Sequence, residues 1–173
     1  MKKTIKYFVI ALTTLVMIAA LTACGSTPAD TSATTPKDEL KDYINNNFVK
    51  TFGPENNAIV DAYGVAADSG DNNTIAKALA ETLTPKNDAL LEKLKAFKPK
   101  TTEVQELHNI LTQAVELRKD AYAQLLGIVT NKNVTDAAVD AAFNKLGESD
   151  DKFMEFNTKG DSLKKELGLV DGK

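Results

Sequence analysis

A seam of apolar and small residues recurs in steps of three and four between residues 139 and 167, and this spacing constrains the fold more than any other feature. Its members are Val139, Ala142, Leu146, Ser149, Phe153, Phe156, Gly160, Leu163 and Leu167. Such a seam follows one side of an α-helix and predicts a partner helix packed at about 20° in a left-handed supercoil. At its small positions, Ser149 and Gly160, we expect a bulky neighbouring side chain rather than a ligand.

Three earlier regions, 37–66, 75–97 and 102–128, carry similar apolar spacing, with few β-branched runs and no alternating strand pattern. Four long amphipathic regions joined by short turns favour an all-α fold. We therefore predict an antiparallel up-down four-helix bundle over residues 37–168. Residues 169–173 are predicted to form a frayed tail.

Two prolines complicate the first two helical regions. Proline lacks an amide donor and disfavours helix in the residue before it, so we expect a kink or a restart at Pro54 and at Pro85. In the second case Thr84 is predicted to be the N-cap. Breaks at both prolines would give five or six shorter helices. Residues 102–105 read Thr-Glu-Val-Gln, a capping box that predicts the start of the third helix.

The first 23 residues have the pattern of a secretory signal. Three lysines, Lys2, Lys3 and Lys6, precede an apolar stretch over residues 8–21, and small residues precede Cys24. A bilayer-spanning helix needs about 20 predominantly apolar residues, and this stretch is shorter. The pattern therefore indicates a cleaved leader, with an uncleaved N-terminal anchor as the alternative.

Leu21-Thr22-Ala23-Cys24 resembles the lipobox of bacterial lipoproteins. The resemblance implies cleavage between Ala23 and Cys24, and a diacylglyceryl thioether on Cys24 with fatty chains such as palmitate. One acyl chain binds a membrane only marginally, so stable anchoring needs two. A buried free thiol is the alternative, but the chain has no second cysteine with which to form a disulfide. We expect the mature protein on the extracytoplasmic face of the cell membrane.

Residues 24–36 join this anchor to the bundle. After Cys24 they are rich in Ser, Thr and Pro and contain no large apolar side chain, which predicts a disordered tether spanning about 20 Å. Three lysines leave with the leader, so 21 basic residues become 18 against 24 acidic ones, a formal charge of −6. This balance argues against a nucleic-acid partner and disfavours broad adhesion to anionic headgroups. The membrane link is therefore expected to be the lipid on Cys24.

Two polar residues of the third helical region do not fit its pattern. Arg118 lies well inside the apolar arc at 100° per residue, and His108 lies at the edge of that arc. A buried guanidinium needs a carboxylate. Arg118 is therefore expected to form a structural ion pair or to extend to the rim, and the alternative is recognition of an anionic ligand inside the bundle. His108 is expected to be structural or to lie at the rim.

A single histidine disfavours several kinds of catalytic site. A ferritin-like di-metal site requires two Glu-x-x-His pairs, and a haem could use only His108 and Met154, which points away from its helix's apolar seam. Glu148, Asp150 and Asp151 form an acidic run that is expected to be a solvated helix face. We therefore expect no catalytic residue, no metal and no cofactor.

The helical part resembles small all-helical lipoproteins of unknown function from Gram-positive bacteria. The expected function is that of a non-catalytic binding or scaffolding module with a protein partner at the cell envelope. The alternative is a small-molecule or ion carrier with a pocket in the bundle centred on Arg118, and an enzyme is the third possibility.

Overall fold

The computed structural model describes residues 34–131 and 134–169, so Ala23, Cys24 and the predicted tether up to residue 33 lie outside the described residues. Every regular element in these two ranges is helical. The elements are α1 (Pro36–Asp42), η2 (Tyr43–Phe52), α2 (Gly53–Asp68), α3 (Asn72–Ala78), η3 (Leu79–Leu83), α4 (Thr84–Ala96), α5 (Thr102–Thr130) and α6 (Asp136–Glu166). The predicted all-α class is confirmed.

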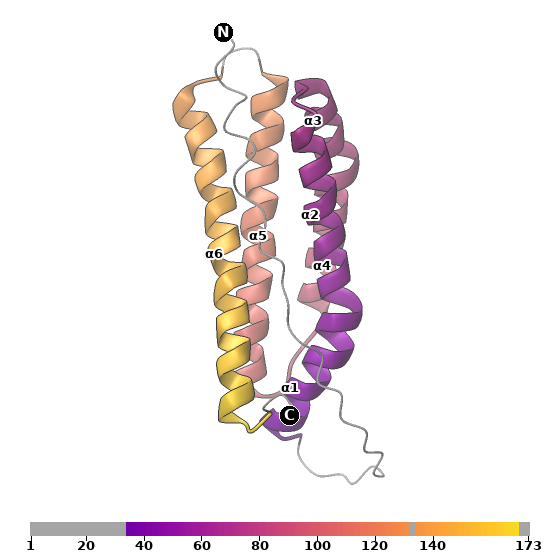
Figure 1. Cartoon of the computed structure of the whole chain (residues 1–173), viewed down its shortest axis with the longest axis vertical. Coiled ribbons are helices and arrows are strands. Elements are labelled where there is room, and N and C mark those ends of the chain that lie inside the picture. Colours follow the sequence, from indigo (N-terminus) through magenta and orange to yellow (C-terminus); the bar gives the residue numbers. More distant parts are fainter. Residues whose placement is uncertain (1–33, 132–133, 170–173) are drawn as a thin grey trace.

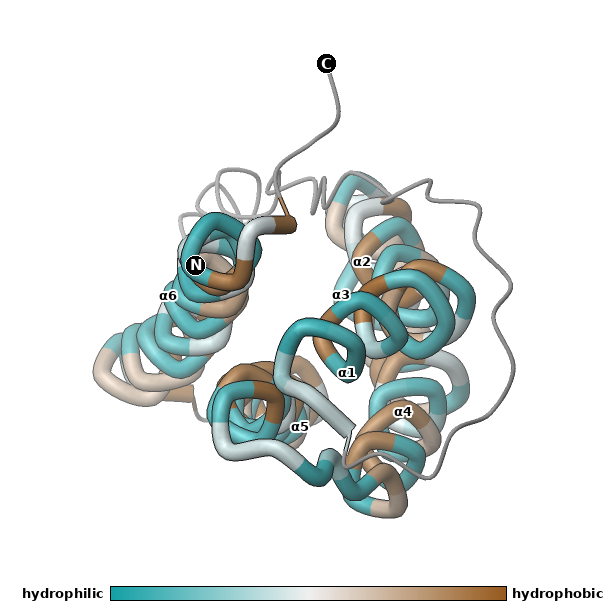
Figure 2. Tube along the Cα trace, turned by 90° about the horizontal axis from the view of Figure 1, so that it is seen from below, coloured by the Kyte–Doolittle hydropathy of each residue, from teal (hydrophilic) through white to brown (hydrophobic). Residues whose placement is uncertain are grey.

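The elements form four long helices (Figure 1). α1, η2 and α2 follow one another directly and make the first helix, and α3, η3 and α4 make the second. α5 and α6 are the third and fourth. In the end view α5 lies between α4 and α6, and it packs against both (Figure 2). α5 is thus the central helix, and side chains on its inner face can reach all the others.

The chain passes both prolines without leaving the helical conformation. The residue before each proline, Gly53 and Thr84, keeps right-handed helical angles, and each donates its N–H five residues back, to Phe48 O and Leu79 O. The turns before each proline, η2 and η3, are thus wider π-helix. A wider turn gives room to the proline ring, which would clash with a carbonyl in a regular α-helix. No restart occurs, and the predicted N-cap role of Thr84 is wrong.

The third helix begins differently from the predicted capping box. Its N-cap is Thr101, one residue earlier, and that side chain makes no capping hydrogen bond. The Gln105 amide donates to the carbonyl oxygens of Pro99 and Lys100 at 3.0 and 3.3 Å. A carboxylate from another helix caps instead: Glu39 accepts from the N–H groups of Lys100 and Thr101 at 2.6 and 2.7 Å. These bonds hold the pKa of Glu39 below its usual value, although burial acts in the opposite direction.

Both ends of α6 are formed by residue types typical of helix ends. Thr135 caps its start by accepting from the N–H of Ala138, and Gly168 ends it with φ of +66°. Glycine suits this left-handed position because it has no Cβ. The predicted seam faces inward along most of its length. Ser149 is buried and donates to Ala114 O at 2.8 Å, and Gly160 lies beside Leu107 of α5.

Three segments meet at one end of the molecule, which we call the α1 end. There the Lys37 ammonium donates to Gly168 O at 3.4 Å, which joins the start of α1 to the residues after α6. The bonds from Lys100 and Thr101 to Glu39 join α1 to the α4–α5 connection. The α2–α3 connection, the end of α5 and the start of α6 lie at the other end (Figure 1). Within the described ranges, no helix has both the length and the apolar character that crossing a bilayer requires.

Candidate functional site

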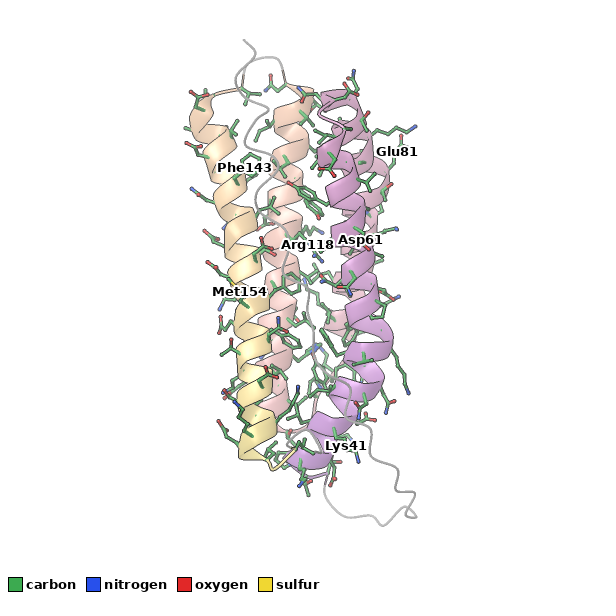
Figure 3. The ribbon with its side chains drawn as sticks, in the orientation of Figure 1. Lys41, Asp61, Glu81, Arg118, Phe143 and Met154 are labelled. Carbon is green, nitrogen blue, oxygen red and sulfur yellow. The ribbon has the colours of Figure 1, made fainter. Side chains whose placement is uncertain are left out.

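Arg118 is the largest fully buried side chain of the described residues, with only 2% of its surface exposed. It projects from the middle of α5 into the interior of the bundle (Figure 3). The sequence placed it correctly within the apolar arc. Burial lowers the pKa of its guanidinium, yet arginine remains protonated in proteins, so the bundle contains a buried positive charge.

Each of the other three long helices contributes a side chain to Arg118. Its Nε donates to Asn87 Oδ1 of α4 at 2.7 Å, and its Nη1 donates to Asn56 Oδ1 of α2 at 2.7 Å. The guanidinium carbon lies 5.2 Å from the centre of the Phe153 ring of α6, a cation–π distance. The Asn87 amide also donates to Val115 O at 3.1 Å. We call Asn56, Asn87, Arg118 and Phe153 the core cluster.

The expected carboxylate partner is not in this cluster. Among the described residues, no acidic side chain forms an ion pair with Arg118, and its hydrogen bonds go to neutral amide oxygens instead. Arg118 Nη2 and the nearby Tyr122 hydroxyl have no hydrogen-bond partner within the described part of the chain, and both atoms are enclosed. Such unsatisfied buried donors are rare in native proteins and call for an explanation.

Asp150 of α6 is the acidic group that interacts electrostatically with Arg118. Burial raises its pKa to about 6, while Arg118 acts in the opposite direction and Asp151 adds a smaller increase. Burial also raises the pKa of Tyr122 to about 12. Asp150 is half-buried, so the sequence expectation of a fully solvated acidic run fits Asp151 but not Asp150.

His108 belongs to a second buried group, nearer the α1 end. Its Nε2 lies 2.9 Å from Leu94 O, and because a carbonyl only accepts, Nε2 carries the hydrogen. Nδ1 of the neutral ring then accepts from the Tyr43 hydroxyl at 3.1 Å. The rings of Phe52 and Phe97 lie 6.1 and 5.3 Å from the imidazole. Burial lowers the pKa of His108, which the Leu94 bond partly opposes.

The geometry around His108 assigns it to structure. Both ring nitrogens are used by the bundle's own groups, and only 4% of the residue is exposed. Met154, the other candidate haem ligand, is 44% exposed on the outer side of α6 (Figure 3). Nowhere in the described ranges do three histidine, cysteine or acidic side chains gather closely enough to hold a metal ion.

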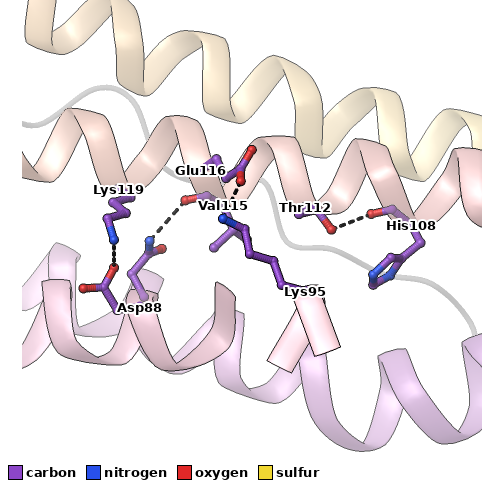
Figure 4. Close-up of polar contacts among 8 residues, drawn as sticks. Asp88, Lys95, His108, Thr112, Val115, Glu116 and Lys119 are labelled. Carbon is purple, nitrogen blue, oxygen red and sulfur yellow. Dashed lines mark hydrogen bonds and ion pairs between the residues drawn. The ribbon is translucent and has the colours of Figure 1, made fainter. Parts of the chain in front are cut away.

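Outside the core, α4 and α5 are joined by ion pairs along their exposed edge. Lys95 pairs with Glu116 at 2.8 Å, and Lys119 pairs with Asp88 at 2.9 Å (Figure 4). All four side chains are substantially exposed, so solvent screens each pair and it contributes little to stability. These pairs align the two helices more than they stabilise them.

Hollows open on the surface of the described residues, two of them beside α5. One of about 360 Å³ lies along the end of α4 and the start of α5, and its lining includes Phe97, Lys98, Gln105 and His108. The other, of about 410 Å³, lies between the last turns of α5 and the start of α6, and its lining is mostly small or apolar. Neither is lined by Arg118.

Sequence reasoning missed both asparagines of the core cluster, although a signal was present. Asn56 lies between Phe52 and Ile59 in the apolar spacing of the first helix, four and three residues from them. Asn87 lies in the same way between Leu83 and Leu90 in the second helix. A polar amide at a seam position indicates a buried hydrogen-bond partner, and Arg118 is that partner.

Comparison with protein-family models, with curated proteins and with solved structures finds no match for this chain. The assignment of function therefore depends on the sequence and on the geometry described above.

Proposed function

We propose that the protein is an extracytoplasmic lipoprotein, anchored by acyl chains on Cys24, whose helical bundle is a non-catalytic binding or scaffolding module. In this proposal the four helices run alternately up and down. Residues 1–23 are removed as the signal peptide, and residues 24–36 connect the anchor to the bundle. The membrane link is the lipid, and the partner is another protein of the cell envelope.

The observation that carries this proposal is the position of α1. The chain enters the bundle at Pro36, and the start of α1 lies at the same end as the α4–α5 connection and the end of α6. A tether of about a dozen residues reaches only about 20 Å, so that end would remain close to the membrane. The opposite end and the long sides would then be free to contact a partner.

The core cluster suits a rigid module. Arg118 contacts one side chain from each of the other helices, which fixes their relative positions along the bundle. Buried polar groups can specify one arrangement of helices in this way, even where they contribute little net stability. A fixed outer surface is what a binding or scaffolding module needs.

A carrier with a pocket inside the bundle is the second candidate. It is favoured by the unpartnered Arg118 Nη2 and Tyr122 hydroxyl, which could donate to an anionic ligand. Because both atoms are enclosed, the helices would have to separate to admit a ligand. The module is therefore the better-supported function.

Crosslinking in the native cells tests the proposal. The lipidated protein is crosslinked on the membrane, and its partners are identified by mass spectrometry. A Cys24→Ser variant is the control. The proposal predicts specific envelope-protein crosslinks that are lost when the variant leaves the membrane. Crosslinks that persist unchanged with a released Cys24→Ser chain would contradict it.

A further inference from the structure

Lysine is concentrated in one short stretch of this acidic chain. Residues 93–100 read Lys-Leu-Lys-Ala-Phe-Lys-Pro-Lys, with four lysines and no acidic residue. The stretch covers the last turn of α4 and part of the α4–α5 connection. All four lysines are exposed. We call Lys93, Lys95, Lys98 and Lys100 the lysine surface.

Two members of the lysine surface have charge available for another molecule. Lys93 and Lys95 pair with glutamates of α2 and α5 at 2.5 and 2.8 Å. Within the described part of the chain, the ammonium groups of Lys98 and Lys100 form no ion pair. An external anion could therefore approach both without breaking an ion pair, and at Lys100 it would share the ammonium with the Glu39 carboxylate, on which that lysine acts electrostatically.

The lysine surface lies at the α1 end. The N–H of Lys100 donates to Glu39 of α1 at 2.6 Å, so this lysine is next to the helix that the tether enters. If the chain is anchored at Cys24, the lysine surface is at the end of the bundle nearest the membrane.

The opposite end is acidic. Asp68 and Asp71 flank the α2–α3 connection, Asp136 and Asp140 lie in the first turns of α6, and all four are exposed. The α2–α3 connection and the start of α6 both lie at the end away from α1 (Figure 1). Acidic side chains, among them Asp38, Asp42 and Glu166, are also exposed at the α1 end. The positive charge that an anionic surface would meet is therefore local to the lysine surface, and the opposite end has no comparable group of lysines among the described residues.

Apolar and hydrogen-bonding groups lie beside the free lysines. Phe97 and Pro99 are half-buried, and with Lys98, Gln105 and Asn109 they line the hollow of about 360 Å³. Lysines interspersed with an aromatic side chain are typical of segments that lie at the headgroup level of a membrane. A phosphate group could meet the Lys98 ammonium and the Asn109 amide here, next to an apolar wall.

We propose that the lysine surface binds the phosphate groups of anionic phospholipids in the membrane that holds the anchor, with Lys98 and Lys100 as the contact residues. This inference rests on the proposed anchoring at Cys24. Each lysine near an anionic surface strengthens binding about fivefold, so two lysines alone would hold a free protein only weakly. A short tether keeps the surface at an effective concentration of about millimolar, where weak contacts suffice. The bundle is then oriented with its α1 end toward the membrane.

Amine labelling on vesicles tests this orientation. The lipidated protein is placed in vesicles of phosphatidylcholine alone, or with about a quarter phosphatidylglycerol, and lysine labelling rates are read by peptide mass spectrometry. We expect Lys98 and Lys100 to react about fivefold more slowly on the anionic vesicles, with the difference lost at high salt. Lys77 and Lys86, exposed and distant from the α1 end, are the internal controls and should not change. Equal rates for Lys98 and Lys100 on both vesicles would overturn the proposal.

Paired variants separate a specific contact from general attraction. In Lys98→Gln/Lys100→Gln, the protection of a third lysine at the α1 end, Lys165, should be lost. In Lys77→Gln/Lys86→Gln, which removes the same charge elsewhere, that protection should remain. Loss of protection in both variants, or in neither, would contradict the assignment.

Two further controls identify the source of any protection. If inorganic phosphate without vesicles protects Lys98 and Lys100 equally, the surface is a site for soluble phosphate and the membrane proposal is wrong. The lysine surface can also be tested if the proposed lipid anchor is wrong. If the native protein carries no acyl chain, a Cys24→Ser chain is tested by flotation with the anionic vesicles. Weak, salt-sensitive flotation that Lys98→Gln/Lys100→Gln reduces about 25-fold supports the lysine surface, and no flotation refutes it.

Discussion

Replacing Asn87 with leucine tests whether the core cluster holds the bundle together. Asn87 is fully buried, and its amide oxygen accepts from Arg118 Nε. Leucine has a similar shape but cannot accept a hydrogen bond. The variant therefore leaves the buried guanidinium with one protein acceptor, Asn56 Oδ1, and the face of the Phe153 ring.

The expected cost follows from these contacts. A hydrogen bond to a charged group contributes about 1.5–3 kcal/mol, and removing one partner of a buried charge costs about 3–5 kcal/mol. Because Arg118 keeps part of its environment, the lower part of that range applies, and the leucine methyl groups recover about 1 kcal/mol. We expect Asn87→Leu to lower the free energy of unfolding by about 2–3 kcal/mol. With Arg118→Met already present, the same change should cost less than about 1 kcal/mol, because no charge remains to be satisfied.

Urea unfolding followed by far-ultraviolet circular dichroism measures the wild type, both single variants and the double variant. Asn57→Leu is the control. Asn57 follows Asn56 on α2 but is exposed, so its replacement should change the free energy of unfolding by less than about 0.5 kcal/mol. The reasoning is refuted if Asn87→Leu behaves like this control. It is also refuted if Asn87→Leu costs the same with arginine or methionine at position 118.

Four other outcomes follow from the same structure. Asp150→Asn should raise the free energy of unfolding near neutral pH. This gain should shrink as the pH falls from about 6 toward 3.8, because Asp150 takes up a proton in the folded protein at a higher pH than in the unfolded chain. Urea unfolding at several pH values across this range measures the gain. Tyr43→Phe removes the donor to His108 Nδ1 and should cost about 1–3 kcal/mol in the same assay. Gly160→Ala should stabilise the protein by up to about 1 kcal/mol, because the added Cβ would lie at an ordinary contact distance of 3.8 Å from a Leu107 methyl group. Gly53→Ala should lower Tm, because its Cβ would lie only 3.1 Å from the Phe48 carbonyl oxygen.

The fold class could be predicted from spacing, whereas two local details could not. The seam of α6 predicted its buried face because helical periodicity alone decides which side turns inward. At Pro54 and Pro85 the known cost of proline predicted a kink or a restart. The helix does not restart, because widening of the preceding turn accommodates the ring. The capping box at Thr102 was displaced by Glu39, a group from another helix. Tertiary contacts of this kind are not visible in local sequence.

The candidate site was only half predictable for a similar reason. The position of Arg118 in the apolar arc follows from 100° per residue, so its burial could be predicted. Its partners could not, because the expected rule, that a buried cation takes a carboxylate, fails in the described part of the chain. Asn56 and Asn87 supply amide oxygens from two other helices. Comparing the polar residues at apolar seam positions across all the helices, rather than in one helix at a time, would have identified the two asparagines.

The distribution of charge also could not be predicted from composition. The formal charge of −6 expected if the proposed leader is removed argues against anionic partners. The fold, however, brings the lysine-rich stretch over residues 93–100 to the end where α1 begins. Net charge describes the long-range field, whereas binding to a surface depends on the face that meets it.

The mass of the protein purified from its native membranes decides whether Cys24 is the lipid anchor. We expect a chain that begins at Cys24 and carries the additional mass of a diacylglyceryl group on that residue, located by fragmentation to the N-terminal peptide. A chain that retains residues 1–23, or that begins at Cys24 with an unmodified thiol, would contradict it.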